Sequence, residues 1–354
     1  MKEDLKHMSI KLAINGFGRI GRLAFRRAYE MNKEAGKEIF EVVAINDLVD
    51  APTLAYLLKY DTTHRTWNKD LISADETNII FDGHKIPVLG QKDPHDLHWK
   101  DYGVDLVLEC TGRLKSHEDG DVHMENGAKG VIISAPSSSK DIPTYVFGVN
   151  TDKLTADQTI ISGASCTTNC LAPMMKVLND KFGVVGGTMT TVHAYTNDQR
   201  ILDLAGKNIR RSRAGAANIV PTSTGAAKAV GKVIPELNGK LNGNAIRVPV
   251  TDGSICDCTL LLKKDVTVEE INAAMKEASE GELKGILGYN DEEIVSSDIL
   301  GRTEGSIFDA TLTMLIPAED KVFVKVASWY DNEYSFTCQM MRLAKKYGEI
   351  LGAK

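Results

Sequence analysis

The stretch Ile10-Lys-Leu-Ala-Ile-Asn-Gly16-Phe-Gly18-Arg-Ile-Gly21 decides the fold that the sequence predicts. A short apolar run, typical of a buried strand, leads into the pattern G-x-G-x-x-G, and a helix-like segment follows from Arg22 to about Lys33. The glycines permit a tight turn, close approach of the backbone to a pyrophosphate, and close packing of helix on strand. The free amides and positive dipole of the helix N-terminus suit phosphate groups. We therefore expect a Rossmann domain that binds a dinucleotide.

A second apolar run, Phe40-Glu-Val-Val-Ala-Ile-Asn-Asp47, ends in an acid where the second strand of a Rossmann domain should end. Asp47 is placed to accept hydrogen bonds from ribose hydroxyls and to repel a 2′-phosphate, which favours NAD over NADP. As a plain surface residue, Asp47 would need no explanation.

Further strand candidates follow in the first half of the chain: Ile79–Phe81, Val104–Cys110, Val131–Ala135, Tyr145–Val149 and Thr159–Ser162. Two of them end in small polar residues, at Thr111 to Arg113 and at Ser134 to Pro136. A dinucleotide lies in the crevice at the carboxyl ends of parallel strands, so these ends are candidate contacts. The isolated histidines show no metal-ligand spacing, and we interpret them as surface or capping residues: His64, His84, His95, His98, His117 and His123.

The stretch Ser162-Gly-Ala-Ser-Cys166-Thr-Thr-Asn-Cys170 places a cysteine between an apolar run and a helix-like segment that begins near Thr167. A thiol at the positive end of a helix dipole is biased toward the thiolate, as a catalytic nucleophile requires. A buried structural cysteine is the alternative interpretation of this stretch taken alone.

The second half of the chain supplies groups that a nucleophilic cysteine needs. A β-rich run delivers His193, a candidate base distant in sequence from Cys166. The basic loop Lys207–Arg213, the pair Thr224-Gly225 and then Arg247 follow. A basic loop alone is usually solvated surface, but together with Thr-Gly and a nucleophile these residues favour recognition of phosphate groups.

The last third alternates strand and helix candidates. We expect strands at Cys258–Leu262, Ala310–Ile316 and Val322–Trp329, and a helix from Val268 to Ser279 that Thr267 caps. The segment Phe336–Leu351 is amphipathic and is expected to pack on a domain.

Composition bounds the class of protein. The chain has 354 residues, enough for two domains, with 43% hydrophobic and 25% charged residues and a net charge of −6. This composition argues against bulk affinity for nucleic acid or membranes. Six cysteines are too few for a disulfide scaffold and lack zinc spacing, so we expect reduced thiols, no metal and a cytoplasmic protein. Residues Met1–Ser9 lack the apolar core of a signal peptide.

Five motifs together carry a family resemblance from Ile10 to the C-terminus: Asn15-Gly-Phe-Gly-Arg-Ile-Gly-Arg22, Ser165-Cys-Thr-Thr-Asn-Cys-Leu-Ala-Pro173, His193-Ala-Tyr-Thr196, Ser223-Thr-Gly-Ala-Ala-Lys-Ala-Val230 and Trp329-Tyr-Asp-Asn-Glu333. With these motifs the chain resembles phosphorylating glyceraldehyde-3-phosphate dehydrogenases.

The resemblance implies an α/β protein with three parts. These are an NAD-binding Rossmann domain at 9–164, an α+β catalytic domain with a mostly antiparallel sheet at 165–331, and a C-terminal helix at 332–354 that packs back on the first domain. It also implies a cytoplasmic homotetramer with NAD as cofactor. The implied reaction is glycolytic: D-glyceraldehyde 3-phosphate, NAD⁺ and inorganic phosphate give 1,3-bisphosphoglycerate and NADH through a hemithioacetal and a thioester on Cys166.

Site residues are carried over position by position. Cys166 resembles the nucleophile and His193 the base, while Thr196 and Arg247 match positions that hold the substrate phosphate. Positions lining the inorganic-phosphate side are matched by Ser165, Thr167, Arg211, Thr224 and Gly225. Cofactor contacts are matched by Gly16, Gly18, Arg19, Ile20, Gly21, Asp47, Lys92, Ser134 and Asn332, the last expected on the nicotinamide carboxamide.

Two departures and three alternatives accompany the resemblance. Many members carry Tyr where this chain has Phe336, and many NAD-specific members carry Leu-Pro where it has Leu204-Ala205, a change that weakens exclusion of NADP. An erythrose-4-phosphate dehydrogenase would share the architecture but hydrolyse its thioester. Surface-adhesin or RNA binding would be a secondary role, and a redox sensor using Cys166 without turnover would not need two anion sites.

Overall fold

A computed structural model describes residues 9–319 and 321–352, and the expectation about a signal peptide therefore lies largely outside the described residues. The chain divides into two compact units. Unit 1 runs to Tyr145 and also contains Lys153–Ala164 and the chain from Met340 onward, whereas unit 2 contains Val146–Asp152 and Ser165–Gln339. Each unit is described by itself.

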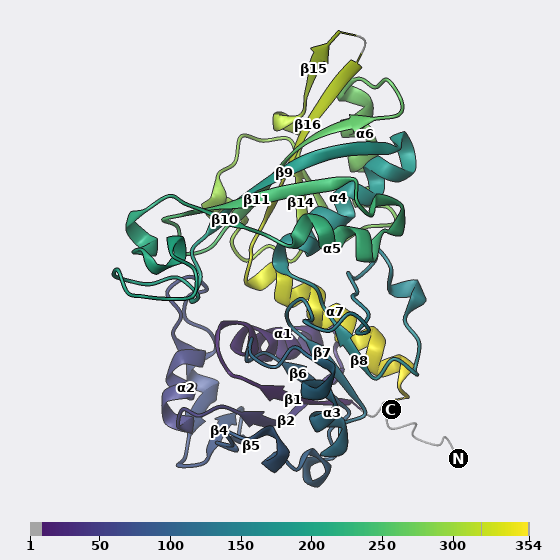
Figure 1. Ribbon diagram of the computed structural model, residues 1–354. Helices are drawn as coiled ribbons and strands as arrows, with labels where there is room; N and C mark the ends of the chain where they lie inside the picture. Colours follow the sequence, from purple (N-terminus) through teal and green to yellow (C-terminus); the bar gives the residue numbers. More distant parts are fainter. Residues whose placement is uncertain (1–8, 320, 353–354) are drawn as a thin grey trace, which may run out of the picture. The chain divides into compact units, whose positions relative to one another are not determined.

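Unit 1 is built on a five-stranded parallel sheet with the strand order β2-β1-β6-β7-β8 (Figure 1). Its main elements are β1 (Ile10–Asn15), α1 (Arg19–Ala35), β2 (Phe40–Asn46), α2 (Ala51–Lys59), β6 (Leu106–Glu109), α3 (His117–Glu125), β7 (Gly130–Ile133) and β8 (Ile160–Ser162). The residues of β6 and β7 are all buried, as expected for central parallel strands covered on both faces. The carboxyl ends of β1, β2 and β6 therefore meet at one edge of this sheet.

A small antiparallel sheet and the end of the chain complete unit 1. The sheet contains β3 (Ile72–Ala74), β4 (Asn78–Phe81) and β5 (His84–Pro87). The last helix, α7 (Tyr334–Ile350), contributes Met340, Leu343 and Tyr347 to the core that also holds Ile10 and Leu12. The amphipathic pattern of α7 therefore reflects packing in this core.

Unit 2 is built on an eight-stranded mixed sheet with the order β10-β11-β9-β12-β16-β14-β13, and β15 pairs with β16 (Figure 1). Its main elements are α4 (Cys166–Phe182), β9 (Val184–Ala194), β10 (Val220–Ser223), α5 (Ala226–Val233), β11 (Leu241–Val248), β12 (Ser254–Leu262), α6 (Val268–Glu280), β13 (Leu287–Asn290), β14 (Ser306–Asp309), β15 (Met314–Ala318) and β16 (Lys321–Tyr330). Only the β9–β11 and β13–β14 pairs are parallel. The predicted fold class, a Rossmann domain plus a domain with a mostly antiparallel sheet, is confirmed.

Two strand predictions were wrong. No strand forms over Tyr145–Val149, because Val146 N donates to the side chain of Asn150 and Gly148 adopts φ +76° in a turn. The predicted strand at Ala310–Ile316 begins instead with a short 3₁₀ turn, in which Thr311 N donates to Asp309 Oδ1, and β15 starts only at Met314. In both places a local side-chain to backbone hydrogen bond competes with the ladder.

Candidate active site

The glycine turn after β1 has three glycines with three different surroundings. Gly16 adopts φ +90°, and a Cβ built there would lie 2.7 Å from the backbone N of Thr111. A Cβ on Gly21 would lie 2.2 Å from Gly16 O, so this glycine allows close packing of α1 on the turn. Gly18 is the N-cap of α1 without a side-chain cap, and nothing lies within 4 Å of its Cβ position. The first amides of α1 consequently face open space that a phosphate can fill.

A pocket of about 320 Å³ opens at this edge of unit 1. Gly16, Gly18, Asp47 and Lys92 all line it. Asp47 Oδ2 accepts from Phe17 N at 2.8 Å and Oδ1 accepts from Val49 N at 3.1 Å, which holds the carboxylate beside the turn with further lone pairs for a ligand. Uncapped amides, a lysine and a carboxylate in one pocket fit the pyrophosphate and ribose hydroxyls of a dinucleotide.

The other expected cofactor residues are not among those that line this pocket. The guanidinium of Arg19 pairs with Asp61, and Ile20 packs partly buried against the core. Ser134 follows β7, and its hydroxyl contacts the thiol of Cys110, which does line the pocket. Asn332 belongs to unit 2 and is described below.

Sequence reasoning missed a buried polar network that supports the pocket. Asn15 Nδ2 donates to Glu109 Oε2 at 2.6 Å, Asn46 Nδ2 donates to Asn15 Oδ1 at 2.8 Å, and Glu109 Oε1 accepts from Thr111 N at 2.8 Å. The available signal was that Asn15, Asn46 and Glu109 each end one of three parallel strands. Asn15 and Asn46 line the pocket, and the buried carboxylate of Glu109 holds Asn15 in place.

The interpretation of His123 as a surface or capping residue was wrong. Its side chain is fully buried, its Nδ1 accepts from Trp99 Nε1 at 3.0 Å, and its Nε2 lies 3.3 Å from Glu109 Oε2. His123 therefore donates to the buried carboxylate of Glu109 and has a structural role in unit 1.

Cys166 and His193 meet in unit 2. Cys166 is the first residue of α4, and Ser165 is the N-cap whose Oγ accepts from Thr168 N at 3.1 Å. His193 lies near the end of β9, with its Nε2 3.5 Å from Cys166 Sγ. Its Nδ1 lies 2.7 Å from Ala194 O, so we assign the proton to Nδ1. This tautomer leaves the lone pair of Nε2 directed at the sulfur.

Burial opposes charge on both groups. It raises the pKa of Cys166 to about 11, although Arg247 and Thr167 act to lower it. Burial and Arg247 together lower the pKa of His193 to about 3. The predicted bias toward the thiolate thus meets a larger opposing effect that the sequence could not reveal. Moving the proton from Sγ to Nε2 creates two opposite charges at once, and their attraction offsets part of this cost.

A cationic group lies beside this pair. Arg247 on β11 pairs in register with His193, and its Nη1 donates to Thr196 Oγ1 at 2.9 Å and to Ala194 O at 3.0 Å. The buried Nε of Arg247 has no hydrogen-bond partner among the described residues. A buried guanidinium with a donor to spare is suited to an anion.

Arg211 and Asp198 lie next to Arg247. Arg211 forms an ion pair with Asp198, and its Nε donates to Thr222 Oγ1 at 3.0 Å. Asp198 also accepts from Thr196 Oγ1. Sequence reasoning assigned no role to Asp198, which here connects the residues expected at the two anion sites.

The remaining expected phosphate residues have clear local positions. Thr167 Oγ1 lies 2.9 Å from Tyr330 OH, so it is tied to β16. Thr224 Oγ1 accepts from Ala226 N at 3.2 Å, and Gly225 is the N-cap of α5, with nothing within 4 Å of its Cβ position. Asn332 is buried, and its Oδ1 accepts from Ser254 Oγ at 2.7 Å.

In the part of the chain that the structure describes, no helix combines the length and apolar composition needed to cross a membrane.

Comparison with known proteins gives matches over both halves of the chain. A family model described as glyceraldehyde 3-phosphate dehydrogenase, NAD binding domain, matches residues 10–117, and its C-terminal domain counterpart matches residues 165–332. Glyceraldehyde-3-phosphate dehydrogenase 1 of Bacillus cereus is 55% identical over 335 residues, which cover 94% of this chain and 97% of the relative. The glyceraldehyde-3-phosphate dehydrogenase of Thermotoga maritima is 57% identical over 327 residues, which cover 92% of this chain and 96% of the relative. The enzyme of the same name from Lactobacillus delbrueckii subsp. bulgaricus is 54% identical over 338 residues, which cover 95% of this chain and 98% of the relative.

Proposed function

The chain belongs to the glyceraldehyde-3-phosphate dehydrogenase family, and on this premise we propose that it oxidises D-glyceraldehyde 3-phosphate with NAD⁺ and inorganic phosphate to 1,3-bisphosphoglycerate and NADH. The observation that carries the proposal is the distance of 3.5 Å between Cys166 Sγ and His193 Nε2, beside the buried guanidinium of Arg247. A nucleophile, a base and an anion site in one place are what oxidation of a phosphorylated aldehyde through a thioester needs.

The first half of the mechanism makes hydride loss possible. An aldehyde holds its hydrogen until a nucleophile adds to the carbonyl, because only the resulting alkoxide can expel hydride. His193 Nε2 takes the thiol proton as Cys166 adds to the carbonyl carbon, and then returns that proton to the former carbonyl oxygen, which gives a neutral hemithioacetal and a neutral imidazole. NAD⁺, when bound, supplies the hydride acceptor. His193 takes the hydroxyl proton of the hemithioacetal as hydride leaves, and the product is a thioester on Cys166.

The second half transfers the acyl group to phosphate. An oxygen of inorganic phosphate attacks the thioester carbonyl, the carbon–sulfur bond breaks, and the Cys166 thiolate leaves. We assign Arg247 and Thr196 to the substrate phosphate. The residues assigned to inorganic phosphate are Ser165, Thr167, Arg211, Thr224 and Gly225. Two separate anion sites allow the attacking and resident phosphates to be held around one carbonyl, which lowers the entropic and electrostatic parts of the barrier.

We assign cofactor binding to Gly16, Gly18, Arg19, Ile20, Gly21, Asp47, Lys92, Ser134 and Asn332. The unit 1 pocket supports Gly16, Gly18, Asp47 and Lys92 of this set, because these residues line it, and the carboxylate of Asp47 favours NAD over NADP. The proposed domain limits are 9–164, 165–331 and 332–354.

We propose a homotetramer in the cytoplasm. Support comes from the segment between β9 and β10, whose large apolar side chains are strongly exposed: Ile201, Leu202, Leu204, Ile209 and Ile219. Water-exposed apolar side chains gathered in one segment are typical of a surface that a second subunit covers.

One assay tests the activity. The purified chain is mixed with glyceraldehyde 3-phosphate and NAD⁺ or NADP⁺, with and without phosphate, and reduced cofactor is followed by absorbance. We expect phosphate-dependent turnover with NAD⁺. Turnover that needs no phosphate would favour hydrolysis of the thioester, as in an erythrose-4-phosphate dehydrogenase.

The variant Cys166→Ala is expected to abolish turnover while NAD⁺ binding persists, because Cys166 lies in unit 2 and the glycine turn in unit 1. Calorimetric titration with NAD⁺ and the activity assay measure the two properties separately. Normal turnover in this variant would contradict the mechanism.

A further inference from the structure

Ser254 joins two functional side chains of unit 2. It is the first residue of β12, only 1% exposed, and its Oγ lies 3.1 Å from Ala194 N and 2.7 Å from Asn332 Oδ1. The amide of Ala194 can only donate, so Ser254 Oγ accepts there. The hydroxyl of Ser254 in turn donates its proton to the amide oxygen of Asn332, which leaves the NH₂ group of Asn332 without a contact to Ser254.

We propose that Ser254 is a positioning residue that holds the side-chain amide of Asn332 with its oxygen inward, so that Asn332 offers its NH₂ group to the ligand as a donor. The inference rests on the proposed function through the assignment of Asn332 to the cofactor. A donor recognises the carbonyl oxygen of the nicotinamide carboxamide and does not need the carboxamide NH₂.

Asp252 holds the backbone of Asn332 in place. Its Oδ1 accepts from Asn332 N at 3.1 Å and from Gly253 N at 2.8 Å. Asp252 and Asp331 are both buried, and the charge of Asp331 acts on the carboxyl group of Asp252. Backbone and side chain of Asn332 are therefore each fixed by a separate buried group.

Backbone amides hold Asp331 in place beside Asp252. Asp331 accepts from three of them, those of Gly301, Glu333 and Tyr334, and the last lies in the first turn of α7. The charge of Asp331 therefore acts on the carboxyl group of Asp252 from a fixed position.

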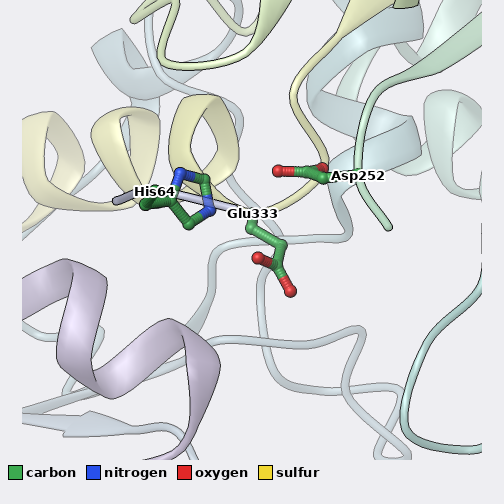
Figure 2. Close-up of side chains that lie close together, drawn as sticks. All are labelled: His64, Asp252 and Glu333. Carbon is green, nitrogen blue, oxygen red and sulfur yellow. The ribbon is translucent and has the colours of Figure 1, made fainter. Parts of the chain in front are cut away.

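Glu333 also lies close to the carboxyl group of Asp252. Figure 2 shows the side chains of Asp252 and Glu333, whose carboxyl oxygens lie within 4.8 Å of each other; His64, also labelled there, belongs to unit 1. Burial and the negative charges of Asp331 and Glu333 raise the pKa of Asp252 to about 10. An amide at position 252 would be neutral like the protonated acid and would keep an oxygen to accept from Asn332 N and Gly253 N.

Ser254 also supports the catalytic histidine. Ala194, whose amide donates to Ser254, accepts the Nδ1 proton of His193 on its own carbonyl. One hydroxyl group thus connects the strand end that orients His193 to the residue assigned to the nicotinamide.

The experiment compares dissociation constants of NAD⁺ and of its 3-acetylpyridine analogue, which keeps the carbonyl but lacks the NH₂ group. Calorimetry is performed on the full chain. For wild type we expect the two constants to agree within about fivefold, and for Ser254→Ala we expect weaker binding of both by about tenfold, since a buried amide oxygen loses its donor. Ser328→Ala removes a buried serine hydroxyl of the neighbouring strand β16, whose contact is Met174 Sδ, and serves as the matched control with unchanged affinity.

A second pair of variants keeps the test decisive if Ser254→Ala does not fold. Asp252→Asn should retain wild-type affinity, whereas Asp252→Leu should lose about as much as Ser254→Ala. Equal affinity of Ser254→Ala and wild type, or a loss above about 50-fold for the analogue with wild type, overturns the inference while leaving the proposed function intact. Failure of wild type to bind NAD⁺ overturns both.

Discussion

Replacing His193 by Asn tests whether the imidazole stabilises the Cys166 thiolate. Asn keeps a polar side chain in place of the ring but cannot take the thiol proton. In wild type, the proton moves over the 3.5 Å between Sγ and Nε2 and leaves two opposite charges. Two unit charges at that distance attract by about 5 kcal/mol at an effective dielectric constant of about 20, equivalent to about 3 to 4 pK units.

Cys166 as a residue is half-buried, and solvent screening reduces this figure, so we expect the midpoint of the pH profile for Cys166 reactivity to rise by about 2 to 3 units in His193→Asn. The shift is upward because the thiolate form of Cys166 is the form that loses its partner, the imidazolium of His193. Without a neighbouring imidazolium the thiolate is destabilised, and only the burial that raises the pKa of Cys166 to about 11 remains, partly opposed by Arg247 and Thr167. Reactivity at neutral pH must fall.

Alkylation by iodoacetamide, a neutral reagent that does not compete for the anion sites, measures the profile between about pH 5 and 10. Mass spectrometry follows the label, and Cys166→Ala shows which labelling belongs to this residue. His84→Asn, at an exposed histidine of unit 1, is the matched control with an unchanged profile. Turnover should fall about 10²- to 10⁴-fold. An unchanged alkylation profile in His193→Asn would refute the proton-transfer reasoning.

Two glycine variants separate binding from folding. Gly18→Ala should fold normally but bind NAD⁺ about tenfold more weakly, because its methyl group meets no protein atom within 4 Å and occupies the space assigned to phosphate. Gly16→Ala should lower the free energy of unfolding by about 1 to 3 kcal/mol, because φ +90° and the backbone of Thr111 both oppose a side chain. Thermal melting and calorimetry distinguish the two outcomes, and equal melting temperatures would count against this account of Gly16. Arg247→Met should raise KM for the aldehyde at least about 100-fold through loss of charge-assisted hydrogen bonds, with little change in NAD⁺ affinity, and an unchanged KM would exclude Arg247 from the phosphate site.

Helices with strong local signals could be predicted closely from the sequence. The predicted helix Val268–Ser279 corresponds to α6, Val268–Glu280, because Thr267 and Glu270 form a capping box that defines its start. Helix α1 begins three residues earlier than predicted, at Arg19, because Gly18 itself is the N-cap. Local chemistry marks these ends.

Strand predictions failed where a side chain offered the backbone another partner. At Tyr145–Val149, the apolar and aromatic residues have strand propensity, but Asn150 accepts the amide of Val146. The buried position of His123 could likewise not be predicted, because its partners Trp99 and Glu109 lie 24 and 14 positions away in the sequence.

The sequence by itself determined the kinds of chemistry available to this protein. A glycine turn between strand and helix, an acid at the end of the second strand, and a cysteine at the start of a helix are local patterns whose backbone requirements can be read without a structure. The motifs also placed the chain in a family, and comparison with known proteins agrees.

Only the tertiary structure decided which groups meet and how charged they are. Cys166 and His193 lie 27 residues apart and reach each other because α4 packs on the sheet that contains β9. Their pKa shifts come from burial, and burial depends on every element packed around them. Hydrogen-bond direction at Ser254, which we infer to orient Asn332, likewise depends on a strand end and a loop 78 residues apart. Long-range packing has no local signature, and for that reason the glycine turn could be understood from its own residues while the active site could not.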